Sequence, residues 1–125
     1  MKLTEELISR WKTFRTLEDQ GCEQLCDIAK ALRRLGLDEV RISYAGRNGS
    51  GTLESVTALD EGKTVELGDE LLQTLRTAAK LLLCGVWSQP EKVWGELVVD
   101  PQERMVTCYS QQDDYDETSG SSWDF

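Results

Sequence analysis

The sequence predicts an α+β fold of the order α(α)-β-β-α-β-β, with helices packed on one face of an antiparallel sheet of about four strands. Two stretches repeat apolar residues at the three- and four-residue spacing of a helix face. Four shorter stretches alternate apolar and polar residues, and they occur as two pairs separated by turn residues. Strand pairs joined by short turns form antiparallel sheets, and amphipathic helices must bury their apolar stripe. We therefore expect the helices to pack on one face of the sheet.

The first helix is predicted over residues 4–36, in two pieces. Thr4 is the expected N-cap, because acidic residues follow it in the first turn. Gly21 is expected to break or kink the helix, and Gly36 is expected to end it. The apolar stripe consists of Leu7, Trp11, Phe14, Cys22, Leu25, Cys26, Ala29, Leu32 and Leu35.

Residues 40–44 and 52–58 are predicted to form the first hairpin, with residues 64–67 as a short further strand. The Asn48-Gly49 pair between the two strands is typical of a tight hairpin turn. The glycine-rich segment 46–51 resembles a phosphate-binding loop, but no helix start follows it. We therefore interpret it as a turn that needs positive φ angles.

A second helix is predicted from Asp69, as its N-cap, to about Cys84, with Gly85 ending it. Residues 93–99 and 104–109 are predicted to form a second hairpin through a proline-containing turn. Polar residues on the predicted strands are expected to face solvent. They are Arg41, Ser43, Glu54, Glu96 and Thr107.

The chain divides into one α+β domain, residues 1–112, and an acidic, aromatic C-terminal tail, residues 113–125. The tail holds five acidic residues, no Lys or Arg, and three aromatic residues. Charge alone would serve solubility, whereas aromatic rings indicate contact with the body of the protein or with a partner. The predicted partner-binding residues are Asp113, Asp114, Tyr115, Asp116, Glu117, Trp123, Asp124 and Phe125.

Trp123 leaves two alternatives open at this stage. It lies in a terminal segment with no clear helical or strand period. Either the segment folds back onto the sheet, or it is a short linear motif that inserts into a groove of a partner.

The formal net charge of −9 favours a basic surface of another protein as the partner. It argues against direct binding of nucleic acid and against anionic membranes, since both reward basic patches. The start of the chain has no apolar leader segment, and no apolar run approaches about 18 residues. We therefore expect a cytoplasmic protein, and we interpret its four cysteines as reduced thiols of the core.

Catalysis, cofactors and metals find little support in the sequence. The chain has no histidine, no nucleophile motif and no cysteine pairs at zinc-binding spacing. We expect no cofactor and no metal, and a non-enzymatic protein. Two alternatives remain: a metal-dependent enzyme that uses carboxylates such as Glu54, Glu96 and Asp114, and a structural homodimer whose tail docks on its own sheet.

Several segments are similar to a family of small, acidic, uncharacterised bacterial and plasmid-borne proteins, over about residues 40–125. The segments are the strand-turn-strand of residues 42–55, the run Trp94-Gly-Glu-Leu-Val-Val-Asp100 with the Arg104-Met-Val-Thr and Tyr109 that follow, and the acidic end that closes on Trp123-Asp-Phe125. The resemblance implies a stand-alone α+β domain that often occurs on mobile elements. It implies no activity, because the family has none assigned.

The charge, the tail and the resemblance lead to one working hypothesis. The protein is expected to be a phage- or mobile-element-encoded inhibitor or regulator of a host nucleic-acid-associated protein. Its carboxylates would occupy a basic channel in place of phosphates.

Overall fold

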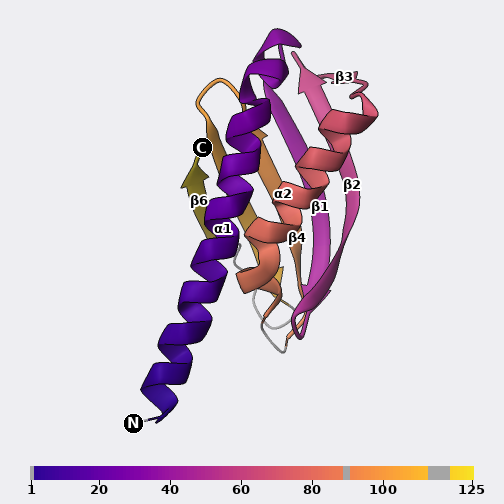
Figure 1. The fold of residues 1–125 in the computed structure, drawn as a ribbon. Coiled ribbons are helices and arrows are strands. Elements are labelled where there is room, and N and C mark those ends of the chain that lie inside the picture. The colour runs from indigo at the N-terminus through magenta and orange to yellow at the C-terminus, as the bar shows by residue number, and fades with distance from the viewer. Residues whose placement is uncertain (1, 89–90, 113–118) are drawn as a thin grey trace.

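A computed structural model describes the backbone of residues 2–88, 91–112 and 119–125, and the side chains of residues 15–88, 91–111 and 122–125. In this range the chain forms two helices and six strands (Figure 1). The α+β class is confirmed, but the sheet has six strands instead of about four. The elements are α1 (Lys2–Arg34), β1 (Glu39–Arg47), β2 (Ser50–Asp60), β3 (Lys63–Val65), α2 (Asp69–Trp87), β4 (Val93–Asp100), β5 (Met105–Gln112) and β6 (Ser119–Asp124).

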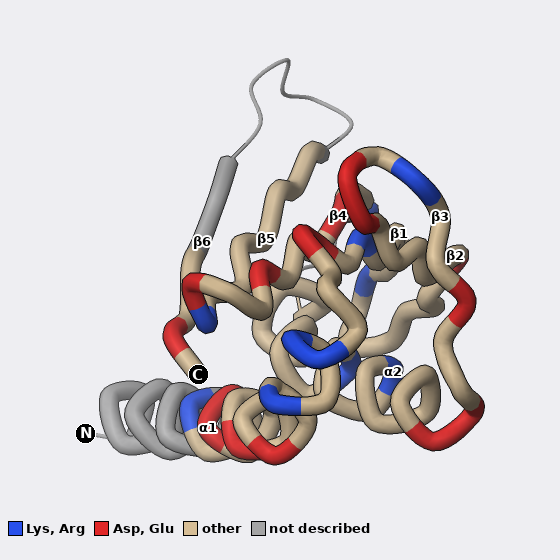
Figure 2. Tube along the Cα trace, turned by 90° about the horizontal axis from the view of Figure 1, so that it is seen from above, with Lys and Arg blue, Asp and Glu red and all other residues tan. Residues whose placement is uncertain are grey.

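The strands form a single sheet in the order β3-β2-β1-β4-β5-β6, and each neighbouring pair is antiparallel. Both helices lie on the same side of this sheet (Figure 2). The core fills the space between the helices and the sheet. Its largest fully buried side chains are Leu25, Leu32, Leu37, Val40, Ile42, Tyr44, Leu75, Leu82, Leu83, Val93, Leu97 and Val99.

Strand β6 is the main addition to the predicted sheet. It pairs with β5 from Met105↔Asp124 to Ser110↔Ser119, so the sheet extends into the segment that the sequence assigned to the tail. Glycine and serine dominate this strand, and such residues are a weak strand signal. Pairing with β5 and packing of Trp123 against the core compensate for the low strand propensity.

Helix α1 is continuous, so the predicted break at Gly21 is wrong. Gly21 is buried against α2, and a Cβ there would lie 3.0 Å from both the carbonyl oxygen of Ala78 and Cγ of Leu82. The missing side chain lets the two helices approach closely. The predicted N-cap is also wrong, since Thr4 lies inside a helix that begins at Lys2. Gly36 ends α1 as predicted, with a φ of 72°.

Helix α2 differs from the prediction at both ends. Its N-cap is Gly68, so Asp69 is the first helical residue. At the other end the helix continues through Gly85 to Trp87. The ring of Trp87 is 5% exposed and packs in the core, which explains why the last turn remains ordered.

The position of Trp87 explains why glycines occur in the first hairpin. Gly46 and Gly51 pair across β1 and β2, and a Cβ on either one would collide with the Trp87 ring. Gly49 has a φ of 84° in the turn, and its N–H donates to the carbonyl oxygen of Trp87 at 2.7 Å. The interpretation of this segment as a turn is therefore confirmed, and its close approach to α2 is an additional reason for the glycines.

We expect Gly46→Ala to lower the free energy of unfolding by about 1–3 kcal/mol, because the added methyl group overpacks the contact with Trp87. Gly68→Ala is the control, since a Cβ at Gly68 meets nothing within 4 Å. It should change the stability by about 1 kcal/mol at most. Urea titrations followed by circular dichroism measure both values, and equal stability of the two variants would contradict this packing.

Candidate functional site

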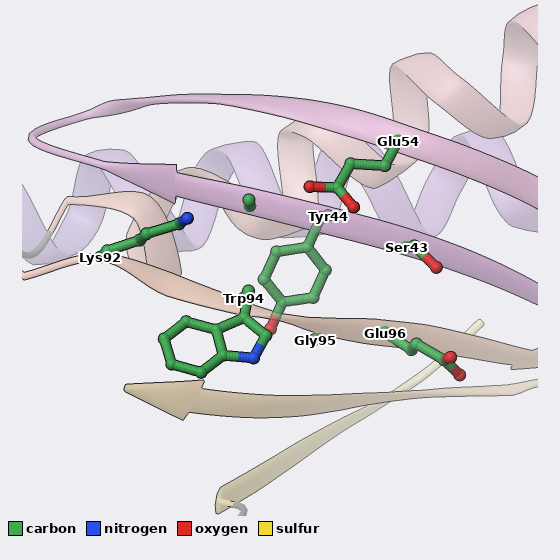
Figure 3. Close-up of a pocket in the computed structure, with 8 residues that line it drawn as sticks. Ser43, Tyr44, Glu54, Lys92, Trp94, Gly95 and Glu96 are labelled. Carbon is green, nitrogen blue, oxygen red and sulfur yellow. The ribbon is translucent and has the colours of Figure 1, made fainter. Parts of the chain in front are cut away.

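The sheet face away from α1 and α2, here called the open face, carries no helix within the described part of the chain. Alternation along β1 sends Ile42 and Tyr44 toward the helices, and it places Arg41 and Ser43 on the open face. A hollow of about 440 Å³ lies at the centre of this face (Figure 3). Its lining residues are Ser43, Tyr44, Ala45, Glu54, Lys92, Trp94, Gly95 and Glu96.

Two neighbouring hollows extend this central hollow along β1 and β4. One shares Gly95 and Glu96 with it and continues to Tyr109 on β5. The other shares Ala45 and Lys92 and continues over the β1–β2 hairpin. The three together form a shallow groove along the open face, which we call the open-face groove.

A β-bulge in β2 brings Glu54 to the groove. Ser43 pairs with Ser55 and Tyr44 pairs with Leu53, so Glu54 is the extra residue of β2. Glu54 and Ser55 are both exposed, whereas regular alternation would turn one of them toward the helices. Glu54 forms no hydrogen bond or ion pair with any other residue that the structure describes.

The floor of the central hollow is held by a close approach of β1, β4 and β5. Tyr44 pairs with Gly95, and a Cβ on Gly95 would collide with the carbonyl oxygen of Tyr109. The Tyr44 hydroxyl donates to this same oxygen at 3.1 Å and lies 3.2 Å from Sγ of Cys108. Tyr44 is 1% exposed, so its side chain is fixed beneath the groove.

Charges of both signs line the groove. Arg41 donates to Glu39 at 3.1 Å, and this hydrogen bond raises the pKa of the guanidinium group. A second nitrogen of Arg41 lies 3.9 Å from Glu96, a longer contact. Lys92 lies at the hairpin end of the central hollow (Figure 3). The carboxylate of Glu54 is thus the acidic group of the groove that lacks a described partner.

Two aromatic side chains complete the site. Trp94 is half-buried and lines the central hollow, and Tyr109 is 48% exposed in the adjoining one. Sequence reasoning assigned no binding role to Trp94 or to Tyr109. The alternation of Trp94 and Glu96 on one strand was the available signal, since residues two apart share a sheet face.

The arrangement offers carboxylates, cations and rings for binding. Glu54 and Glu96, which the enzymatic alternative invokes, do line one hollow. Asp114, its third carboxylate, lies outside the described residues. Within the described ranges, no group of three His, Cys, Asp or Glu residues is placed to hold a metal ion.

The structure separates the predicted tail residues into two groups. Asp113, Asp114, Tyr115, Asp116 and Glu117 lie outside the described residues, in the connection between β5 and β6.

The second group closes the chain. Trp123 and Phe125 are partly buried against the core, whereas Asp124 is exposed. The backbone N–H of Phe125 also donates to the carbonyl oxygen of Arg104 at 2.9 Å. Of the two alternatives for Trp123, the structure therefore has the one in which the segment folds back onto its own sheet.

The interpretation of all four cysteines as core thiols is wrong for Cys26. Cys108 is buried and Cys22 and Cys84 are half-buried, but Cys26 is exposed, and Nη2 of Arg104 lies 2.9 Å from its sulfur. All four thiols are free.

Comparison of the chain with protein-family models, with curated proteins and with solved structures finds no match. The described helices include none with the length and apolar character needed to cross a membrane.

The stability of the protein should fall at alkaline pH through Tyr44. Burial, followed by the contact with Cys108, raises the pKa of Tyr44 above its ordinary value of 10.0. Above pH 10 the unfolded chain therefore releases this proton while the folded protein keeps it, so the contribution is present below pH 10 and lost above it. We expect the wild type to lose about 1.4 kcal/mol per pH unit more than Tyr44→Phe in this range.

Thermal or urea unfolding at several pH values from 7 to 11 measures this difference. Burial also raises the pKa of Cys108, and its contact with Tyr44 partly offsets this rise, so the thiol affects both curves and that of Tyr44→Phe somewhat more. Parallel curves for the wild type and Tyr44→Phe would contradict the fixed, neutral tyrosine.

Trp123→Ala should lower the free energy of unfolding by about 2 kcal/mol, since a half-buried aromatic side chain leaves the core. Ser122→Ala is a matched control on the same strand, because it removes only a 3.4 Å contact with Thr107. If both variants unfolded at the same urea concentration as the wild type, Trp123 would be free for a partner instead.

Proposed function

We propose that this chain is a non-enzymatic, acidic protein-binding domain that binds a basic surface of another protein. The observation that carries the proposal is the open face. It has no helical cover among the described residues, and it carries a groove with two accessible aromatic rings and an unpaired carboxylate. Exposed aromatic residues beside polar groups are typical of the centres of protein interfaces.

Net charge supports a basic partner. The chain has 23 acidic residues against 14 basic ones, so its field attracts cationic surfaces and raises the rate of encounter. The acids of residues 113–117 begin two positions after Gln111, which lines the groove.

The roles of the aromatic residues change in this proposal. Trp123 and Phe125 attach β6 to the core. Trp94 and Tyr109 take over as anchors for the partner, since rings supply large contact areas at low entropic cost. The acids Asp113, Asp114, Asp116, Glu117 and Asp124 keep the role of steering the encounter.

The narrower form of the proposal names the kind of partner. A nucleic-acid-associated host protein has a basic channel for phosphates, and an array of carboxylates can occupy such a channel. A chain encoded by a phage or another mobile element would inhibit or regulate its host in this way.

A metal-dependent enzyme remains the second candidate, because Glu54 and Glu96 line one hollow. Its test is a thermal melt with and without Mg²⁺, Mn²⁺, Ca²⁺ or Zn²⁺. Binding to the folded state must raise the melting temperature, so an unchanged midpoint with every ion would exclude it.

The proposal is tested by neutralising the five acids of residues 113–125. A partner captured from host lysate by the full chain is purified, and its affinity is measured at several salt concentrations. We expect the substitution of all five by Asn or Gln to weaken binding about tenfold or more and to flatten the salt dependence.

The matched control neutralises five exposed acids elsewhere on the surface and should change both quantities much less. They are Asp19, Glu23, Asp27, Glu61 and Glu66. Equal effects of the two variants would show that only the net charge matters. Unchanged affinity in the variant that lacks the five C-terminal acids would overturn the proposal.

A further inference from the structure

We infer that the central hollow is a receptor for an arginine side chain of the partner. This inference rests on the proposed function and gives the chemistry of its central contact. The guanidinium would stack on Trp94 and donate hydrogen bonds to Glu54. Glu96 lines the same hollow but points away from Trp94, so it would contribute its charge and not a direct contact (Figure 3).

The charge at the centre of the hollow favours a bound cation. The bulge presents Glu54 to the open face, and this carboxylate has no ion pair with any described residue. Glu96 has only the 3.9 Å contact with Arg41, which is held more closely by Glu39. Lys92 also lines the hollow, but it forms no ion pair with either carboxylate among the described residues, so both carboxylates can accept a further cation.

The aromatic lining of the hollow favours a planar cation. Trp94 offers a flat aromatic surface beside the carboxylates. A guanidinium group is planar, stacks on indole rings and donates two parallel hydrogen bonds to a carboxylate. Lysine can supply the charge but not the paired, planar geometry, so arginine is the better fit.

The third argument is the rigidity of the floor. Gly95 lies so close to the backbone of β5 that no side chain fits there, and Tyr44 is held by its hydrogen bond to the carbonyl oxygen of Tyr109. A site whose shape is fixed in advance loses little entropy when a ligand binds. Lys92 bounds the hollow at the hairpin end, so the cation is expected between Trp94 and Glu96.

The inference is tested with Nα-acetyl-L-arginine methylamide as the probe and ¹⁵N-labelled full-length protein. We expect a saturable shift of the Trp94 indole N–H and of the Gly95 amide, with a dissociation constant on the order of millimolar. Nα-acetyl-L-lysine methylamide should bind more weakly, and Nα-acetyl-L-glutamine methylamide should give no saturable shift.

Glu54→Gln should weaken binding of the arginine probe about threefold to tenfold, because it removes the unpaired charge and keeps the side-chain size. Glu66→Gln is the matched control: an exposed acid outside the open-face groove that undergoes the same charge change. It should leave the dissociation constant unchanged. The spectra of both variants also report whether the fold is retained.

Absence of a saturable shift at Trp94, or equal binding by the Glu54→Gln and Glu66→Gln variants, would overturn the inference. This failure is distinguishable from failure of the proposed function. Loss of partner binding on neutralising the five C-terminal acids, together with no saturable binding of the arginine probe to the wild type, would leave the protein-binding role intact and remove only the arginine receptor.

Discussion

The close approach of β4 and β5 at Gly95 is the constraint on which the open face depends. No side chain fits at Gly95, because a Cβ there would collide with the carbonyl oxygen of Tyr109, and the Tyr44 hydroxyl donates to this same oxygen. One buried tyrosine thereby fixes three strands relative to one another. The Tyr44 ring packs in the core on the helix side of the sheet, and it supports the groove on the open face. The same side chain therefore contributes to core packing and to the shape of the groove.

The bulge in β2 is the second structural feature on which the site depends. A regular strand would have alternated strictly, and Glu54 and Ser55 would have pointed to opposite faces. The extra residue instead leaves both exposed, and it adds a carboxylate beside Trp94 and Glu96. Bulges are common beside functional sites because they redirect a side chain at small cost to the sheet.

The sequence was informative about elements and less so about their contacts. Periodicity located both helices and both predicted hairpins, and Asn48-Gly49 identified the turn. Two predictions based on glycine were wrong. Gly21 does not break α1 but allows α1 and α2 to approach closely, and Gly85 lies within α2 instead of ending it. Strand β6 has low strand propensity and depends on β5 for its order. The site was predicted only in part: Glu54 and Glu96 were expected on the solvent face, whereas the groove and the bulge in β2 depend on how the strands pair.

Covalent footprinting of the open face tests the central claim most directly. Hydroxyl-radical labelling of the full chain, free and bound to its captured partner, reports the accessibility of Trp94 and Tyr109 in one experiment. The account predicts that the partner protects both rings, while labelling of Leu35, which is 42% exposed at the end of α1, stays unchanged. Protection of Leu35 with continued labelling of Trp94 and Tyr109 would place the partner on the helices and contradict the account.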